Sequence, residues 1–374
     1  MTRGIVKYVL VIALSVCIRL GYSQAISDTL KLTFVGDIMG HDSQIAASID
    51  QQTGKYDYNG VFDKVAPIFK ESDFTIANLE VTLAGPPFKG YPQFSSPDGL
   101  AVACKENGID VLVTANNHSC DRRKSGIIRT IDVLDSLEIL HTGTFRDAIE
   151  KHEKNLLILD KNNIKIGLLN YTYGTNGIPA PAPTIVNNIN WDEMAIDIEA
   201  SKSDNLDKLI VFIHWGTEYE SHPTADQEKL TDYLFNKGVD IIIGSHPHVI
   251  QRMEYRSKTA DTKERFIAYS LGNFVSNQRK RKRDGGVLAR LTLVKDDQGT
   301  RIDKSGYHLI WVNKPKVGGR LKFQVVSGGA YENKQFDSMD SISVQQMNLF
   351  LKDSRELLNK ENIGVGELTN FPEN

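Results

Sequence analysis

The chain has 374 residues, of which 40% are hydrophobic and 24% charged, and its formal net charge is −3. This length and composition predict a packed globular core, in one large domain or two ordinary ones. The acidic balance argues against a general nucleic-acid binder, and we expect no nucleic-acid partner.

Residues 1–24 have the pattern of a secretory signal peptide. Arg3 and Lys7 precede the apolar stretch YVLVIALSVCI (8–18), and the small or polar residues GYSQA (21–25) follow it. The apolar stretch is short for a membrane span, although a retained N-terminal anchor is the alternative. We therefore expect an exported protein that is periplasmic, secreted or associated with the cell envelope. Cleavage would remove three positive charges and no acid, which leaves the mature chain at −6.

Apolar runs that end in polar residues recur along the chain. Short apolar runs bounded by turn residues predict strands, and in the first run we expect a short strand that ends at Gly36-Asp37. The runs are KLTFVGDIMG (31–40), FTIANLE (74–80), IDVLVTANNHSCD (109–121), KLIVFIHWGTEYE (208–220), VDIIIGSHPHV (239–249) and RFIAYSLGNF (265–274).

Helical patterns lie between these runs. Apolar residues recur at helical spacing in GIIRTIDVLDSLEI (126–139) and in ADQEKLTDYLFNK (225–237). Strands that alternate with helices, most of them continuously apolar, predict an α/β fold with both sheet faces covered. In such folds, functional sites collect where the strands end.

The C-terminal part of the chain has a different pattern. From Gly285, the runs GGVLARLTLV, GYHLIWVNKP and LKFQVV predict meandering antiparallel strands, and residues 341–360 predict one helix. We predict a main domain over residues 25–295, with strands and a helix over residues 296–374 that complete or extend it. A separate small domain from about residue 290 is the alternative.

The polar residues at the strand ends combine carboxylates, imidazoles and one carboxamide. Such oxygen and nitrogen donors, without thiolate, suit hard and borderline divalent cations. Two cations about 3.5–4 Å apart can clamp the attacking and leaving oxygens of a phosphoryl group. Each residue alone has a structural interpretation, such as a turn or a helix cap, but the combination favours a metal site. The set is Asp37, Glu80, Asn117, His118, His214, His246 and His248.

Six motifs occur in the order known from one protein family. They are VGDIM (35–39), ANLE (77–80), TANNHSCD (114–121), HWGTEY (214–219), GSHPHV (244–249) and SLGNF (270–274). Over roughly residues 31–277 the chain resembles the CapA, or poly-γ-glutamate biosynthesis, family of metallophosphatase-like (calcineurin-like) proteins. The resemblance implies a four-layer α/β sandwich, in which two packed mixed sheets are flanked by helices.

The resemblance also implies a site that binds two divalent ions (Mn, Fe, Zn or Mg) and in which a phosphoester is hydrolysed. It gives each matched residue a role in this site. His118 matches the histidine that helps to protonate the leaving group. Glu80 stands where metallophosphatases usually carry a bridging Asp. The other matched ligands are Asp37 and His248 for the first metal, and Asn117, His214 and His246 for the second.

Other positions have competing interpretations. Where the wider superfamily has Asp-x-His, this chain has Met39, which is no ligand for a hard metal, and His41 is a candidate replacement. We expect Asn116, Glu218 and Asn273 on the substrate side of the site. Glu218 could instead orient an imidazole or lie on a surface loop, and Asn273 could cap a turn.

One strongly basic segment follows the last motif. Residues 279–283 read RKRKR, which predicts either a solvated loop or a landing site for an anionic polymer. The resemblance also implies a rival function without catalysis. In that role the chain is an accessory or anchoring protein that binds an anionic capsule polymer such as poly-γ-glutamate, with membrane-associated capsule machinery as its partner.

Overall fold

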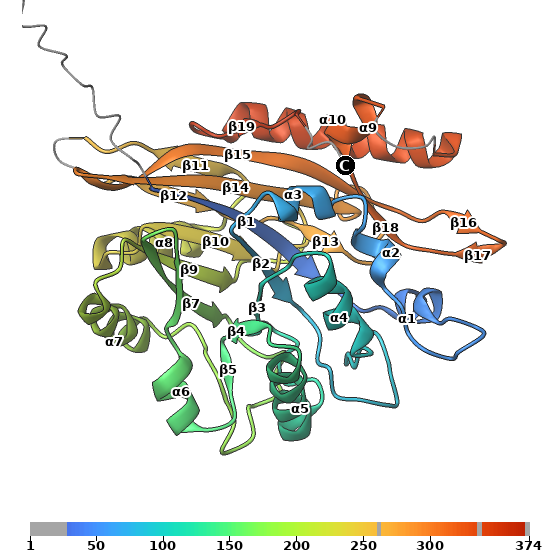
Figure 1. Ribbon diagram of the computed structural model, residues 1–374, viewed down its shortest axis with the longest axis horizontal. Coiled ribbons are helices and arrows are strands. Elements are labelled where there is room, and N and C mark those ends of the chain that lie inside the picture. The colour runs from blue at the N-terminus through green and yellow to red at the C-terminus, as the bar shows by residue number, and fades with distance from the viewer. Residues whose placement is uncertain (1–27, 260–262, 335–338, 371–374) are drawn as a thin grey trace, which may run out of the picture.

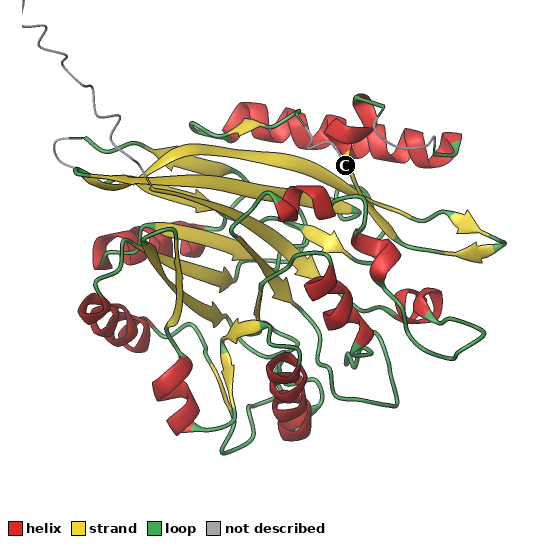
Figure 2. Cartoon of the chain, viewed as in Figure 1, coloured by secondary structure: helices red, strands yellow, loops and turns green. Residues whose placement is uncertain are grey.

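Two mixed β-sheets pack face to face, and helices cover their outer faces (Figures 1 and 2). This computed structural model describes residues 28–259, 263–334 and 339–370. The arrangement confirms the predicted α/β sandwich. The predicted signal peptide, residues 1–24, lies outside the described residues. Within the described ranges, no helix combines the length and apolar character that a membrane crossing needs.

The larger sheet has nine strands in the order β18-β15-β14-β1-β2-β3-β4, with β13 paired to β1 and β19 to β15. β1 to β4 pair in parallel, whereas β14, β15 and β18 join through antiparallel pairs. Its strands are β1 (Asp28–Ile38), β2 (Phe74–Leu79), β3 (Val111–Val113), β4 (Leu140–Thr142), β13 (Asn273–Val275), β14 (Gly285–Asp296), β15 (Gly299–Asn313), β18 (Gln324–Ser327) and β19 (Gly366–Glu367).

The smaller sheet has six strands in the order β11-β12-β10-β9-β7-β6. The four strands β7, β9, β10 and β12 pair in parallel, and the two edge strands are antiparallel to their neighbours. Its strands are β6 (Leu157–Lys161), β7 (Ile164–Thr172), β9 (Lys208–His214), β10 (Ile241–Ser245), β11 (Met253–Arg256) and β12 (Arg265–Ala268).

Helices and two short ribbons surround the sheets (Figure 2). The ribbons pair β5 (Thr144–Phe145) with β8 (Ile185–Val186), and β16 (Lys316–Val317) with β17 (Arg320–Leu321). The helices are α1 (Asp42–Ser48), α2 (Asn59–Phe62), α3 (Ala66–Lys70), α4 (Gly99–Glu106), α5 (Arg123–Ser136), α6 (Ala148–Lys154), α7 (Trp191–Ser201), α8 (Ala225–Lys237), α9 (Gly328–Glu332) and α10 (Ser341–Glu361), with a 3₁₀ turn at Lys202–Asp204.

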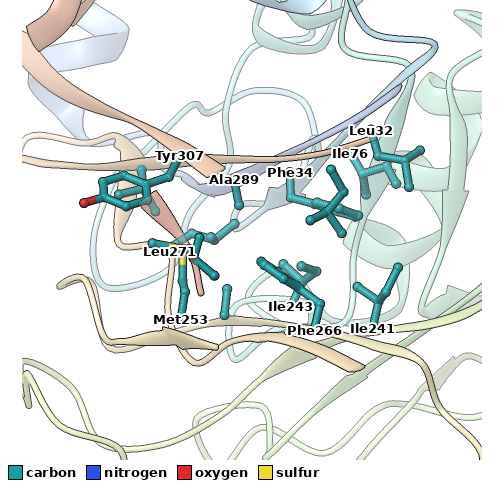
Figure 3. Packing of buried hydrophobic residues seen from close by; sticks show 14 of the residues in the cluster. Leu32, Phe34, Ile76, Ile241, Ile243, Met253, Phe266, Leu271, Ala289 and Tyr307 are labelled. Atoms are coloured by element: carbon teal, nitrogen blue, oxygen red, sulfur yellow. The ribbon is translucent and has the colours of Figure 1, made fainter. Parts of the chain in front are cut away.

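The main hydrophobic core lies between the two sheets, and Figure 3 shows their side chains facing one another. Leu32 and Phe34 project from β1, and Ile241 and Ile243 project from β10 into the same cluster. Ile242 points the other way and packs in the cluster beneath α7 and α8. Because successive side chains alternate across a strand, a continuously apolar run lets β10 fill both layers.

The first strand is longer than predicted. β1 has 11 residues and continues through Asp37 to Ile38, because it pairs with β2 along one edge and with β14 and then β13 along the other. Its register against both parallel partners shifts at Asp37, and such a bulge re-aims a side chain. Gly36 permits the close approach there, since a Cβ at Gly36 would lie 2.1 Å from the carbonyl oxygen of Gly272.

The C-terminal strands belong to the larger sheet rather than to a separate sheet. β14 pairs with β1, and β15 pairs with β14 from Gly299 to Trp311. α10 packs on β15, and its Met347 and Phe350 share the core cluster of Phe34 (Figure 1). Residue 296 as a domain boundary stays a prediction.

Candidate metal centre

The predicted ligands come together between the carboxyl ends of the two sets of parallel strands. Asp37 lies in β1, Glu80 directly follows β2, and Asn117 lies in the loop after β3 of the larger sheet. His214 is the last residue of β9, and His246 and His248 follow β10 of the smaller sheet. All six are buried. Strands that end side by side therefore gather residues that are far apart in sequence.

The first group of candidate ligands consists of Asp37, Glu80 and His248. His248 Nδ1 lies 3.2 Å from Asp37 Oδ2, and its Nε2 lies 3.7 Å from Glu80 Oε1. Asn273 orients this imidazole: its Oδ1 lies 3.1 Å from Nδ1, while its Nδ2 donates to the carbonyl oxygen of Arg283 at 2.8 Å. Because a carboxamide oxygen only accepts, Nδ1 carries the proton and Nε2 keeps a lone pair for a metal.

The second group consists of Glu80, His214 and His246. His214 Nε2 lies 3.1 Å from Asn117 Oδ1 and 3.6 Å from Glu80 Oε1, and its Nδ1 lies 2.9 Å from the hydroxyl of Ser245. The rings of His214 and His246 have centroids 4.8 Å apart. Nδ1 of His246 is buried without a hydrogen-bond partner among the described residues.

Glu80 is common to both groups and has no other partner. Its side chain is 0% exposed, and neither carboxylate oxygen makes a hydrogen bond within the described part of the chain. Burial, followed by the nearby Asp37 carboxylate, raises the pKa of Glu80 well above its usual value. A buried carboxylate without donors is costly unless cations or donors compensate it. The orphaned oxygens of Glu80 therefore fit divalent cations.

The surroundings of His214 and His246 favour the neutral imidazole, which is the form that binds metals. Burial, followed by the neighbouring His246, lowers the pKa of His214 well below its usual value. Burial and His248 lower the pKa of His246 to about 3.

The backbone after β10 is strained where it presents two of these imidazoles. His246 has φ of 100° and His248 has φ of 56°, both in the left-handed region. Such a conformation costs on the order of 1–3 kcal/mol for a residue with a side chain and is concentrated at functional sites. The strain is consistent with a segment shaped for binding rather than for stability.

His118 is held beside the ligands by an aspartate that the sequence interpretation did not assign. Its Nδ1 lies 2.8 Å from Asp121 Oδ2, which also accepts a hydrogen bond from the backbone N–H of Phe94 at 2.7 Å. The ring of Phe94 meets the His118 ring edge-on, with centroids 4.6 Å apart. With Nδ1 fixed by Asp121, Nε2 is the nitrogen left for chemistry. The spacing of three residues between His118 and Asp121 was the available signal.

The three residues expected on the substrate side occupy different places. Asn116 is buried, and its Nδ2 donates to the carbonyl oxygen of Leu79 at 2.8 Å while its Oδ1 accepts from the His118 backbone N–H. Asn273 begins β13 and orients His248 as described above. Only Glu218 is exposed to solvent at the rim. Asn116 and Asn273 thus contact the loops and ligands of the site, and a substrate contact for them stays a prediction.

Two tyrosines flank the site at the surface, and sequence reasoning missed both. Tyr173 is 46% exposed, and its ring lies 4.5 Å from that of His246. Tyr219 is 37% exposed, lies 6.1 Å from the His248 ring, and donates its backbone N–H to the carbonyl oxygen of Pro247. The sequence gave no indication of either tyrosine, because the residues at the strand ends do not predict which loop residue packs against a histidine.

The two departures near β1 have a structural explanation. Met39 is 2% exposed and packs in the hydrophobic cluster on the helix side of the larger sheet. His41 precedes α1, where its Nδ1 lies 3.0 Å from Gln44 Oε1 and 3.2 Å from the backbone nitrogen of Asn277. His41 belongs to neither group of candidate ligands found within the described residues. Met39 therefore contributes to the hydrophobic core and does not take part in the candidate metal centre.

Comparison with known proteins places the chain among capsule proteins. The family model of the bacterial capsule synthesis protein PGA_cap matches residues 31–278. Capsule biosynthesis protein CapA of Bacillus anthracis is 29% identical over 287 residues, which cover 74% of this chain and 66% of CapA. The PGA biosynthesis protein CapA of Bacillus subtilis (strain 168) is 28% identical over 281 residues, which cover 73% of this chain and 70% of that protein.

The match covers slightly less than two thirds of the length of the Bacillus anthracis relative. Among solved structures, Haemophilus influenzae NAD nucleotidase (NadN) is similar with a TM-score of 0.48 and 15% sequence identity, over 88% of this chain and 68% of that chain. The family match covers more than half of the chain and includes every strand end that contributes a candidate ligand. This chain therefore belongs to the PGA_cap family of bacterial capsule synthesis proteins.

Proposed function

We propose that this chain hydrolyses a phosphoester in capsule or poly-γ-glutamate biosynthesis, with two divalent cations held between its sheets. The observation that carries the proposal is Glu80, which belongs to both groups of candidate ligands while both of its oxygens lack a hydrogen-bond partner among the described residues. A carboxylate in this position is suited to bridge two cations. The capsule biosynthesis names of the two Bacillus relatives support the biological setting.

The residues around the centre suit such a hydrolysis. Bound divalent cations would supply charge stabilisation for a phosphoryl oxygen and would lower the pKa of water. Nε2 of His118 would donate a proton to the leaving oxygen, because Asp121 holds Nδ1. The first-group ligands Asp37, Glu80 and His248 and the second-group ligands His214, His246 and Asn117 would hold one cation each, with Glu80 shared.

The test is metal analysis of the purified chain, together with hydrolysis of bis(p-nitrophenyl) phosphate and p-nitrophenyl phosphate. We expect metal-dependent turnover. His246→Ala should lose metal, whereas His118→Ala should keep its metal and lower kcat by about 10²–10⁴-fold. Full activity in both variants would refute the proposed mechanism, and an absence of metal and turnover in the wild-type chain would refute the hydrolase.

We also propose that the chain acts outside the cytoplasm, at membrane-associated capsule machinery. The support is the basic start, apolar stretch and small-residue end of residues 1–24. N-terminal sequencing of the protein recovered from the cell envelope or medium should find a start near residue 25. An unprocessed chain recovered only from the cytoplasm would contradict export.

A second candidate function is non-catalytic binding of an anionic capsule polymer. It is favoured by Met39, which packs in the core at the position where the wider superfamily supplies a histidine ligand. In this case Lys280 and Lys282 are the exposed lysines of the basic segment that a polymer can reach. Poly-γ-glutamate should then bind the metal-free chain, and the Lys280→Gln/Lys282→Gln variant should bind it more weakly. Equal binding by the wild-type chain and the variant would exclude Lys280 and Lys282 as the binding site for the polymer.

A further inference from the structure

The basic segment 279–283 does not act as one charged surface, because its arginines have different surroundings. Arg279 donates to the carbonyl oxygen of Val312 at 2.6 Å and lies over the Trp311 ring. Arg281 makes two hydrogen bonds of 2.6 Å to the Asp353 carboxylate. These two arginines therefore stabilise the fold. Arg283 is the arginine of this segment that lies next to the metal centre.

The side chain of Arg283 is half-buried and has no acidic partner within the described residues. Its Cζ lies 3.2 Å from the centroid of the Tyr219 ring, and among the described residues its guanidinium contacts no carboxylate or carbonyl acceptor. A guanidinium carries five N–H donors in a planar fork that matches carboxylate or phosphate oxygens. Stacking on Tyr219 holds this plane while its edges stay available for an anion.

The backbone of Arg283 is fixed relative to the candidate ligands. The carbonyl oxygen of Arg283 accepts from Asn273, which orients His248, and the Tyr219 ring contacts both the Arg283 guanidinium and the His248 ring. Arg283 is thus one aromatic ring away from a metal ligand and lies at the exposed side of the site.

We propose that Arg283 binds a second anionic group of the substrate, a carboxylate or a further phosphate, beside the reacting phosphoryl group. This inference rests on the proposed function, because it places the phosphoryl group at the metal centre. It narrows the substrate class to phosphoesters whose alcohol part carries its own negative charge. Tyr219 acts as a positioning residue, since it holds the guanidinium plane.

The test measures binding, so that it does not depend on turnover. The full chain, loaded with Mn²⁺, is titrated calorimetrically with phenylphosphonate, para-carboxyphenylphosphonate and para-phenylenediphosphonate. The wild-type chain should bind the two probes with a second anion about tenfold or more tightly than phenylphosphonate, as expected for charge-assisted hydrogen bonds. Comparison of the carboxylate and phosphonate probes identifies which anion Arg283 prefers.

Variants decide whether Arg283 is responsible. Arg283→Gln should abolish most of the preference, and Arg283→Lys should retain part of it, because the charge stays while the fork is lost. Lys280→Gln, which removes an exposed charge of the same segment, should keep the wild-type preference. Thermal unfolding of each variant verifies that the fold is intact.

An equal preference in Arg283→Gln and wild-type protein would overturn the inference, and so would a wild-type chain without any preference. Hydrolysis of p-nitrophenyl phosphate is measured separately. Failure of hydrolysis with an Arg283-dependent preference would refute the proposed reaction but not the anion site. Hydrolysis without the preference would refute the anion site alone.

Discussion

Two buried glutamates lie in opposite kinds of surroundings. Glu264, directly before β12, is 9% exposed, and both of its carboxylate oxygens have partners: Lys208 lies 3.1 Å away, Tyr255 donates at 2.9 Å, and the backbone N–H of Ile302 donates at 2.7 Å. Glu80 is 0% exposed and makes no hydrogen bond to a described residue. The protein thus satisfies one buried carboxylate with its own donors and leaves the other open.

The difference separates a structural carboxylate from a candidate ligand. Burying an unpaired charge costs several kcal/mol, so a fold that keeps one has a use for it. Around Glu80, Asp37 Oδ2 and His246 Nδ1 are also buried without hydrogen-bond partners in the described ranges. Asp37 and His246 each share a group of candidate ligands with Glu80, so these open groups lie where cations are proposed to bind.

The sharpest use of this contrast is a matched pair of substitutions, Glu80→Gln and Glu264→Gln. Glu80→Gln should lose metal and, since bound metals supply several kcal/mol to the transition state, lower kcat by about 10³-fold or more. Its metal-free form should be at least as stable as wild type, because an unpaired buried charge is removed. Metal content, turnover and denaturant unfolding measure these effects.

Glu264→Gln should behave in the opposite way. It leaves Lys208 buried without its counter-charge, which should lower the free energy of unfolding by about 3–5 kcal/mol. Its metal content should stay that of the wild-type chain. The contrast fails if both variants lose the same property, whether metal or stability.

Asp121→Asn should produce the next largest effect. A carboxamide can present its N–H to Nδ1 of His118 and so disturb the tautomer that leaves Nε2 as the donor. We expect kcat to fall by about 10–100-fold, as for other residues that orient a functional group, while metal content stays unchanged. A variant that lost metal together with activity would show that Asp121 supports the ligands rather than His118.

Asn273→Ala should weaken the first metal more than the second. Removing the acceptor of the His248 Nδ1 proton should lower metal affinity by about 10–100-fold. Asn187→Ala is a control, since Asn187 is a buried carboxamide that bonds to Asn155 and Asn170 instead of the ligands. If the control lowered metal affinity equally, the orienting role of Asn273 would be wrong.

Met39→His should leave metal binding at the candidate centre unchanged, which is the smallest effect expected among these variants. Restoring the superfamily histidine places a polar ring in the cluster on the helix side of the larger sheet, away from the ligands. We expect unchanged metal stoichiometry and a loss of about 1–3 kcal/mol in unfolding free energy. A gain in metal affinity would show that the β1 bulge can turn position 39 toward the site.

Much of the fold and of the ligand set could be predicted from the sequence. Continuously apolar runs such as Ile241–Ile243 indicated strands buried on both faces, and the polar ends of such runs gave Asp37, Glu80 and the histidines. Predicted helix 225–237 coincides with α8, whereas α5 begins at Arg123, before the predicted start at residue 126. These features depend on the local periodicity of apolar residues, which can be read from the amino-acid sequence alone.

The rest depends on contacts that periodicity does not encode. β1 extends beyond its predicted end because β13 pairs with Asp37, a partner more than 200 residues away. The stacking of Arg283 on Tyr219 requires two loops from different sheets to meet. Arg281 and Arg283 lie in one basic run, and only their tertiary contacts distinguish them: Arg281 pairs with Asp353, whereas Arg283 lies over Tyr219.

The central claim is that two cations bind between the sheets and share Glu80. Its most direct test is a crystal structure of the metal-loaded chain with anomalous scattering measured at the metal edge. The account predicts two peaks, one beside Asp37 and His248 and one beside His214 and His246, both in contact with Glu80. An absence of both peaks, or peaks that leave Glu80 without a metal contact, would contradict it.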